Sequence, residues 1–298
     1  MATAGNGSRL KQTASALPWL SPALALIVAI VLFPAGVMVY TSTRDLSLSG
    51  VDRGGVGLDN YRQVFENDGV PRVLLNTAIW VSGVVLVTVL ISLALAQFLN
   101  KEFPGRRTIR LAILIPWAAS VVMTTTVFYY MLEPNVGILN KFLVQIHVLD
   151  ETFGFTKQPT SALAVAMVVG VFVSVPFTTY TILAGLQTIP TEILEAADVD
   201  GVSPWQRYTR IVLPQLRGAL AVAVIINIIN VFNSLPILRV ITGDLPGIEA
   251  DTTTSLTFKL LTLYREPALA QALSVFNFGL VLVIIVVYMA VTRPLRED

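Results

Sequence analysis

The sequence predicts an all-α polytopic membrane protein with six transmembrane helices, and its composition and the spacing of its charges support this class. Of the 298 residues, 54% are hydrophobic and only 13% are charged, and the mean hydropathy is +0.72, far above that of soluble domains. The sequence contains several uncharged intervals, each of which reaches the roughly 20 residues that a helix needs to cross the hydrocarbon core. Because lipid leaves backbone polar groups unsatisfied, each interval is expected to be helical. The six intervals are 12–43, 73–100, 111–132, 158–191, 218–238 and 267–292.

The first interval and the basic residues outside the intervals set the expected orientation. The interval contains Pro18, Pro22 and Pro34, which predict a helix that bends or begins late. The apolar stretch is too long for a signal peptide, so we expect this span to be retained. Lysine and arginine are denser in the two tails, and in the second and fourth connections, than in the other connections. This density predicts cytoplasmic termini, with a tail over 1–16 and a six-span domain over 17–298.

The residue types that are missing exclude several classes of function. The sequence has no cysteine, which excludes disulfides, thiolate metal sites and cysteine nucleophiles. The single histidine, His147, falls in a polar loop, where we expect it to be solvated and to form no metal site. A net charge of +1 is not typical of a nucleic-acid-binding protein. The sequence contains no G-x-x-x-x-G-K-[ST] phosphate loop, and the six intervals contain no acid or histidine for a proton relay. We therefore expect energy for transport to come from another polypeptide.

The longest polar, helix-coded interruption between the intervals runs from 190 to 214. Thr191 is expected to cap a first helix, which Asp200-Gly201 then ends, because glycine adopts the left-handed conformation that a helix C-cap requires. Ser203 and Pro204 are suited to the N-cap and first position of a second helix. This interruption is therefore predicted to fold as helix, sharp turn and helix.

The first of these helices has the character of a docking element. Glu195 is followed by Ala196 and Ala197, which remove bulk beside one charged side chain. Such a helix can enter a groove on another protein and present the carboxylate for a salt bridge or hydrogen bond. An ordinary amphipathic surface hairpin is the alternative interpretation.

Three runs in this loop resemble the EAA loop of the membrane-spanning permease subunits of ATP-binding-cassette importers. They are Glu195-Ala196-Ala197, Asp200-Gly201 and Ile211-Val212-Leu213-Pro214. One departure is Arg217-Gly218-Ala219, which stands where a proline is common in the family. The resemblance implies the type I importer permease fold. It also implies that residues of about 191–204 form a coupling helix in the cleft of a partner ATPase, which binds ATP and Mg while this chain holds no cofactor.

Weaker matches extend the resemblance to sugar-type permeases over nearly the whole chain from about residue 17. The loop from Thr242 to Thr254 resembles an outward-facing Thr-Gly-Gly-Pro region, which is expected to face a solute-binding protein; a plain turn-rich loop is the alternative. The other matches are Gly57-Leu58-Asp59-Asn60-Tyr61, Asn76-Thr77, Gly105-Arg106-Arg107, Arg110, Pro116-Trp117 and Gly137-Ile138-Leu139-Asn140.

Four polar residues in the fifth interval are candidates for solute contact. Asn227, Asn230 and Ser234 are spaced to share one helical face, with Asn233 adjoining. Their side chains either bond neighbouring helices, as polar residues commonly do in membranes, or bind a neutral, hydroxyl-rich ligand. By resemblance, Asn227 and Ser234 fall on positions that line the sugar site of maltose-type permeases, and the other two lie beside them.

Four further candidates come from the third and fourth intervals. By the same resemblance, Gly170, Ser174 and Phe177 fall on lining positions, although Gly170 and Phe177 lack the polar groups that some relatives have there. Trp117 matches an aromatic position near that site, where a ring could stack on the C–H face of a sugar. An interfacial tryptophan in an aromatic belt is the alternative for Trp117.

The resemblance as a whole implies a permease subunit of a carbohydrate importer in a bacterial inner membrane. Expected partners are a second, related permease, an ATPase dimer and an extracytoplasmic solute-binding lipoprotein. A disaccharide such as trehalose or maltose is the expected substrate, and the tail ending soon after Arg293-Pro294 resembles the maltose-F type. The alternatives are import of a glycerol phosphate, a secondary carrier that works alone, and a membrane anchor or assembly factor. An anion is disfavoured because the spans contain no lysine or arginine.

Overall fold

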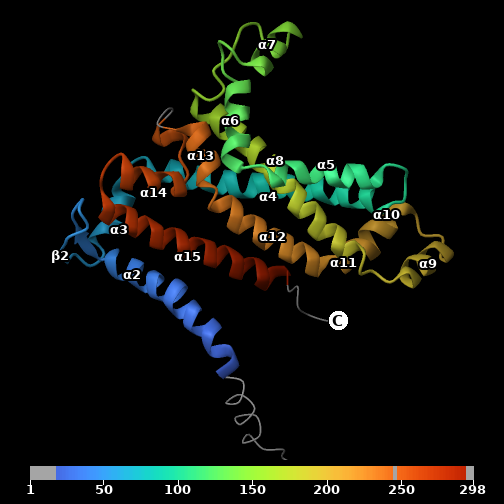
Figure 1. The fold of residues 1–298 in the computed structure, drawn as a ribbon, viewed down its shortest axis with the longest axis horizontal. Helices are drawn as coiled ribbons and strands as arrows, with labels where there is room; N and C mark the ends of the chain where they lie inside the picture. Colours follow the sequence, from blue (N-terminus) through green and yellow to red (C-terminus); the bar gives the residue numbers. More distant parts are fainter. Residues whose placement is uncertain (1–17, 244–246, 293–298) are drawn as a thin grey trace, which may run out of the picture. The chain divides into compact units, whose positions relative to one another are not determined.

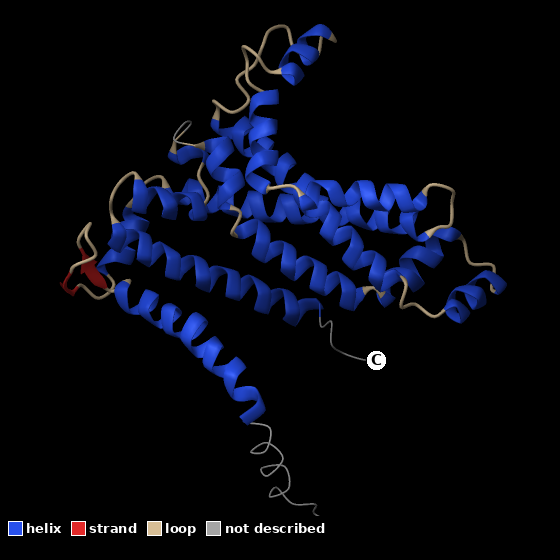
Figure 2. Ribbon diagram, viewed as in Figure 1, coloured by secondary structure: helices blue, strands red, loops and turns tan. Residues whose placement is uncertain are grey.

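A computed structural model describes residues 18–243 and 247–292, which are helical apart from one short hairpin and the connecting loops (Figure 2). The predicted tail 1–16, the carboxyl end at Arg293-Pro294 and Pro246 of the carboxyl-side loop lie outside the described residues. The chain divides into two compact units, Met1–Glu66 with Leu260–Val275, and Asn67–Lys259 with Phe276–Asp298.

The first unit contains the first predicted span as one continuous helix, Pro18–Thr41. Its irregularity is a π-helical stretch, η1 (Val28–Leu32), followed by α2 (Phe33–Thr41). Pro34 has no N–H to donate to the carbonyl four residues earlier, so the helix is expected to deviate beside it. In the structure, the prolines therefore leave the helix continuous, and Pro34 is accompanied only by a local change in its hydrogen bonding.

A hairpin and a short helix complete the described amino-terminal part of this unit. Strands β1 (Arg44–Leu46) and β2 (Asp52–Gly55) pair antiparallel, and α3 spans Asp59–Glu66. Asn60 donates to the carbonyl oxygens of Ser42 and Arg44, both at 2.9 Å. The Gly57–Tyr61 motif thus has a structural role, because its asparagine joins the helix α3 to the end of α2 and the hairpin.

The second unit is organised around three long helices that lie side by side, α4 (Val70–Asn100), α8 (Pro159–Leu186) and α12 (Arg217–Phe232) (Figure 1). Buried Trp80, Val84, Val169 and Val231 belong to the larger of two hydrophobic clusters. The second cluster includes Leu99, Ile182, Val212 and Leu216. The two clusters hold the three helices together near the middle of α4 and near its end.

Four helices in the described chain are long and apolar enough to cross a membrane, or up to six if each of two bent pairs is one span. The third predicted interval is bent by 91° between α5 (Arg106–Ala118) and α6 (Val121–Met131). The second bent pair joins Pro204–Gln215 to α12 at 70°. The fifth interval is also not one helix, because α12 ends at Phe232 and α13 (Leu235–Thr242) begins after a break at 233–234.

The remaining elements are α7 (Ile138–Gln145), η3 (Ile248–Ala250), α14 (Thr253–Thr262) and α15 (Pro267–Thr292). Asn140, which is fully buried, donates to the carbonyls of Leu132 and Phe153 and accepts the N–H of Phe153. A Cβ at Gly137 would overlap the backbone of Glu133. Asn140 and Gly137, which belong to a run that resembles sugar-type permeases, therefore have packing roles in the segment 132–158. In the same segment, His147 is exposed as expected.

Candidate functional site

The eight predicted solute-contact residues line a single cavity of about 510 Å³ in the second unit. One comes from α5, three from α8, two from α12 and two from the break between α12 and α13. They are Trp117, Gly170, Ser174, Phe177, Asn227, Asn230, Asn233 and Ser234. The structure therefore brings together residues from three intervals that the resemblance had assigned to one site.

The lining of this cavity is uncharged and combines several polar groups with a larger apolar area. Among the described residues that surround it, none is Lys, Arg, Asp or Glu, and the polar groups are amides and hydroxyls. Apolar area comes from the rings of Trp80, Trp117 and Phe177 and from aliphatic side chains. Amides and hydroxyls both donate and accept hydrogen bonds, so this lining suits a neutral polar molecule with an apolar face.

Asn227 differs from the other amides because it is buried and bonds a neighbouring helix. Its side chain is 2% exposed and its Nδ2 donates to Thr178 Oγ1 at 2.6 Å and to the Ala223 carbonyl at 2.8 Å. The first of these bonds joins α12 to α8. The geometry at Asn227 thus agrees with the interpretation in which a membrane amide bonds a neighbouring helix.

The other polar candidates are more accessible. Asn233 donates to the carbonyl of Ile229 at 2.9 Å, within its own helix end. Within the described part of the chain, the side chains of Ser174, Asn230 and Ser234 have no hydrogen-bond partner, and Asn230 is exposed. These three are therefore the groups best placed to exchange water for a solute, and that contact stays a prediction.

Trp117 and Gly170 shape the cavity in different ways. The Trp117 side chain is 57% exposed and lies two residues before the 91° bend that ends α5. A Cβ at Gly170 would lie 3.0 Å from the ring of Trp80 and 3.3 Å from both methyl groups of Val84. Gly170 therefore lets α8 approach α4 closely, which is a packing role that needs no polar group.

Sequence reasoning missed Trp80, which also lines the cavity. Its side chain is 1% exposed, and Nε1 donates to the carbonyl of Val231 at 2.8 Å. A signal was available, because Trp80 lies four residues after Asn76 and the two must share one face of the helix. The signal was weak, since a tryptophan in a span is more often a packing residue.

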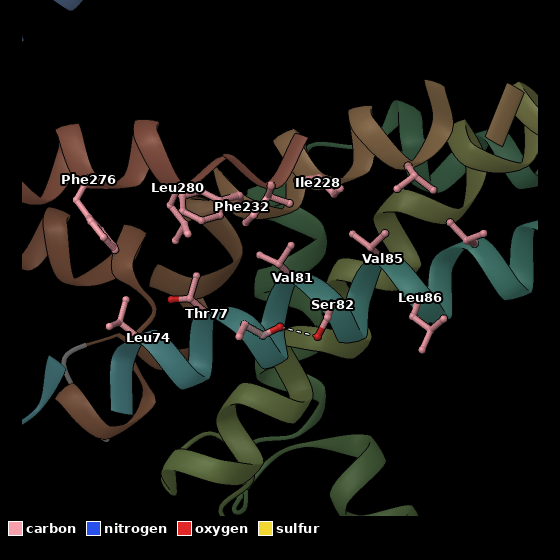
Figure 3. A pocket seen from close by; sticks show the side chains of 14 residues that line it. Leu74, Thr77, Val81, Ser82, Val85, Leu86, Ile228, Phe232, Phe276 and Leu280 are labelled. Carbon is pink, nitrogen blue, oxygen red and sulfur yellow. Dashed lines mark hydrogen bonds between the residues drawn. The ribbon is translucent and has the colours of Figure 1, made fainter. Parts of the chain in front are cut away.

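A second cavity of about 620 Å³ lies between α4, α12 and α15 (Figure 3). Its lining is aliphatic and aromatic except for Thr77 and Ser82. Both hydroxyls donate within α4, to the carbonyls of Val73 at 2.7 Å and Ala78 at 2.6 Å. With no polar group directed to a ligand, this cavity is chemically unsuited to a polar solute although it is the larger of the two.

The predicted docking loop has the expected turn but not the expected first cap. Helix α9 (Thr191–Val199) begins after Pro190, which is its N-cap, and no side chain caps it. The prediction that Thr191 is the cap was wrong, because Pro190 is already extended and Ile193 N–H donates to its carbonyl. Asp200 is the C-cap as predicted, and Gly201 has a φ of +68°.

The second helix of the loop, α10 (Pro204–Arg207), begins as predicted. Ser203 is its N-cap and forms a capping box with Gln206. The chain continues through π-helical η2 (Tyr208–Val212) and α11 (Leu213–Gln215). As at the first span, the π stretch ends two residues before a proline, here Pro214, whose missing N–H has the same effect.

The tip of the loop presents a charged and apolar surface. Glu195 and Ala196 are exposed whereas Ala197 is buried, and Val199 and Trp205 are 89% and 73% exposed. An ion pair between Asp198 and Arg207, which the sequence pattern did not indicate, joins α9 to α10. The ion pair thus holds the two helices of the loop together, and their exposed face carries apolar side chains, as a contact surface would.

Long apolar helices, bent spans and an uncharged polar cavity between them define a polytopic membrane transport protein. The sequence matches the family described as binding-protein-dependent transport system inner membrane component over residues 60–293, and the chain belongs to this family. It is a transport subunit and not an enzyme.

Two relatives and one solved structure illustrate the match. The chain is 31% identical to a probable ABC transporter permease protein of Brucella suis biovar 1, over 93% of this chain and 96% of the relative. It is 30% identical to the trehalose/maltose transport system permease protein MalF of Thermococcus litoralis, over 97% and 98%. A bacterial alginate ABC transporter, solved with its alginate pentasaccharide-bound periplasmic protein, matches with a TM-score of 0.80 at 21% identity, covering 98% of each chain. The fold is therefore that of an ABC importer permease.

Proposed function

We propose that this chain is the permease subunit of an ATP-driven sugar importer and that the 510 Å³ cavity forms its part of the solute pathway. The observation that carries the proposal is that the eight residues expected at the solute site, which come from three predicted intervals, line one uncharged cavity. Its volume is within the roughly 300–1,000 Å³ typical of small-molecule sites. A disaccharide of the trehalose or maltose kind is the favoured substrate, since the Thermococcus litoralis relative is named for both.

The residues that line the cavity also favour a neutral sugar over a phosphorylated substrate. A glycerol phosphate would require cations or helix amino termini to balance its charge. The amino-terminal turn of α13 lines the cavity, but no Lys or Arg occurs among the described lining residues. Trp117 and exposed Asn230 line the same cavity, which thus offers a ring and an amide for the C–H face and the hydroxyls of a sugar. A neutral sugar therefore fits better than a phosphorylated solute.

The loop of α9 and α10 is the proposed contact with a separate ATPase. Glu195 is exposed near the middle of α9, and within the described residues it has no ion-pair partner. Nucleotide binding by that partner would supply the differential energy for switching between inward-open and outward-open states, because this chain has no phosphate loop. This assignment places 191–204, and both termini, in the cytoplasm of a bacterium.

Two further partners complete the proposed assembly. A second, related permease would supply the other half of the pathway. A solute-binding protein would deliver the sugar at the loop from 242 to 254, in keeping with the periplasmic protein in the alginate transporter complex. The bilayer is the inner membrane.

The test is uptake by the reconstituted assembly. The chain, its partner permease, its ATPase and its binding protein are placed in proteoliposomes, and ATP-dependent uptake of trehalose, maltose and glycerol 3-phosphate is measured. We expect sugar uptake, and we expect Asn230→Leu to raise KM about tenfold, since a lost hydrogen bond that leaves a polar solute group unpaired costs about 1–3 kcal/mol. Asn135→Leu, in the loop before α7, is the control.

Three outcomes would replace the proposal. Uptake of glycerol 3-phosphate without sugar uptake would assign the phosphorylated solute. Uptake by this chain alone without ATP would make it a secondary carrier. An Asn227→Leu plus Asn230→Leu double variant that supports wild-type uptake would show that the cavity is not the pathway and that the chain acts as an anchor.

A further inference from the structure

The end of α12 lies inside the protein, next to the cavity, and its last carbonyl groups need partners. A helix leaves its last four carbonyl oxygens without intrahelical donors. Leu235 N–H, which would continue the helix, instead donates to the Asn233 carbonyl at 2.8 Å. The carbonyls of Val231 and Phe232 are therefore released from the regular helical pattern at the point where two cavity residues, Asn233 and Ser234, follow.

Side chains from two other elements bind these two carbonyls. Trp80 of α4 donates from Nε1 to the Val231 oxygen at 2.8 Å, and Thr254 of α14 donates from Oγ1 to the Phe232 oxygen at 2.8 Å. The Val231 oxygen also accepts the N–H of Ser234 at 3.1 Å. The helix end is thus capped by two tertiary contacts in addition to the local N–H of Ser234.

The same helix α4 also holds the segment that carries Thr254. Asn76 donates from Nδ2 to the carbonyls of Glu249 at 2.8 Å and Asp251 at 3.0 Å. Thr77 Oγ1 accepts the N–H of Thr253 at 2.9 Å. Side chains on one part of α4 therefore set the position of both capping groups.

A buried ion pair strengthens this arrangement. Lys259 Nζ lies 3.0 Å from Asp251 Oδ1, and the two side chains are 8% and 0% exposed. Ser255 Oγ donates to the same Asp251 oxygen at 2.8 Å. A buried charge pair holds its geometry because separating the charges would leave each of them unpaired.

We propose that Trp80 and Thr254 are positioning residues for the solute cavity. By capping the Val231 and Phe232 carbonyls, they determine where the break at 233–234 directs its side chains. The break is held at one place because each capping group is itself fixed, Trp80 by close packing under Gly170 and Thr254 by its attachment to α4. The effect on transport rests on the proposed function, whereas the effect on the geometry of the break does not.

The first experiment measures the geometry of the break without any solute. The sequence has no cysteine, so Ser234→Cys provides a single reactive thiol on the full chain in its assembled complex. The rate of alkylation by a water-soluble maleimide is compared with and without Thr254→Val and Trp80→Phe. We expect each change to alter the rate about fivefold or more, the effect of one hydrogen bond, and Thr254→Ser to restore it.

The control is Thr242→Val, because the Thr242 hydroxyl is buried and donates only to the Leu238 carbonyl of its own helix. This change removes a buried hydroxyl from the helix that follows the break without touching the cap, and the alkylation rate should not change. Equal rates in the wild-type background, Thr254→Val and Trp80→Phe would overturn the proposal. If the Trp80→Phe variant fails to assemble, Thr254→Val alone decides the test, because valine is close to isosteric with threonine.

The second experiment separates this inference from the proposed function. In proteoliposomes, Thr254→Val should raise KM for trehalose or maltose about fivefold while kcat changes less than about twofold, because the cap positions binding groups without taking part in ATP-driven steps. If the variants change the alkylation rate but the wild-type complex takes up neither sugar, the positioning role stands and the proposed sugar substrate is wrong. Unaltered alkylation with normal sugar uptake would reject the positioning role alone.

Discussion

Gly170→Ala tests the close approach of α8 to α4. The new Cβ would lie 3.0 Å from the Trp80 ring and 3.3 Å from both methyl groups of Val84, and all three residues are buried. Contacts this short require the neighbours to move, and Trp80 is held by its hydrogen bond to the Val231 carbonyl. Overpacking of this kind costs about 1–3 kcal/mol.

The intrinsic effect of Gly→Ala must be removed from the comparison, because alanine favours a helix interior by about 0.5–1 kcal/mol. Gly279→Ala is the matched control. Gly279 lies inside α15. Apart from the backbone of its own helix and its chain neighbours, no atom lies within 4 Å of the Cβ that alanine would introduce. The difference in the free energy of unfolding between the two variants therefore isolates the packing cost.

The assay is reversible unfolding in mixed detergent micelles, followed by far-UV circular dichroism. We expect Gly279→Ala to be neutral or stabilising and Gly170→Ala to be less stable than it by about 1–3 kcal/mol. Equal stabilities for the two variants would refute the reasoning, because they would mean that the ring of Trp80 can move without cost.

Three other predictions address the bridge to α8, the docking loop and the loop before α7. Asn227→Leu removes an interhelical hydrogen bond and should lower the free energy of unfolding by about 1–3 kcal/mol in the same micelle titration, whereas a pure solute contact would leave it unchanged. Glu195→Ala should leave the subunit folded but abolish ATP-dependent uptake, with exposed Glu192→Ala as the control; uptake at the wild-type rate would remove the docking role. Backbone N–H donation from Val136 lowers the pKa of Glu133, so the carboxylate stabilises its turn above the usual carboxyl pKa, and this contribution is lost as the pH falls through the lowered pKa. The amide protection factors of residues 133–137, which correct exchange rates for their intrinsic pH dependence, should therefore fall at acid pH in the wild type but not in Glu133→Gln.

Local chemistry predicted the fold of the loop formed by α9 and α10 in most of its detail. A glycine with positive φ ends α9, and the serine-proline pair begins α10, because these residues act through their own backbone and immediate neighbours. The same reasoning placed the first cap one residue late, at Thr191. The competing extended conformation of Pro190 decided that boundary, and a single sequence position does not reveal such a competition.

The roles of the polar residues in the fifth interval could not be assigned from their spacing. Asn227, Asn230 and Asn233 are the same residue type within two helical turns, yet one amide bonds α8, one is free in the cavity within the described chain and one bonds its own helix end. The difference depends on which neighbour lies opposite each side chain. Periodicity predicts that the residues share a region, but not which of them is left for a solute.

The sequence by itself determined the membrane class, the approximate places of six apolar intervals and the family motif, because hydrophobicity, charge and turn chemistry are properties of local runs of residues. Only the tertiary structure decided where two intervals break, which carbonyls Trp80 and Thr254 bind, and which of two cavities is polar. Each of these depends on contacts between residues far apart in the chain. Such contacts are set by how α4, α8, α12 and α14 pack together, and no local pattern encodes that packing.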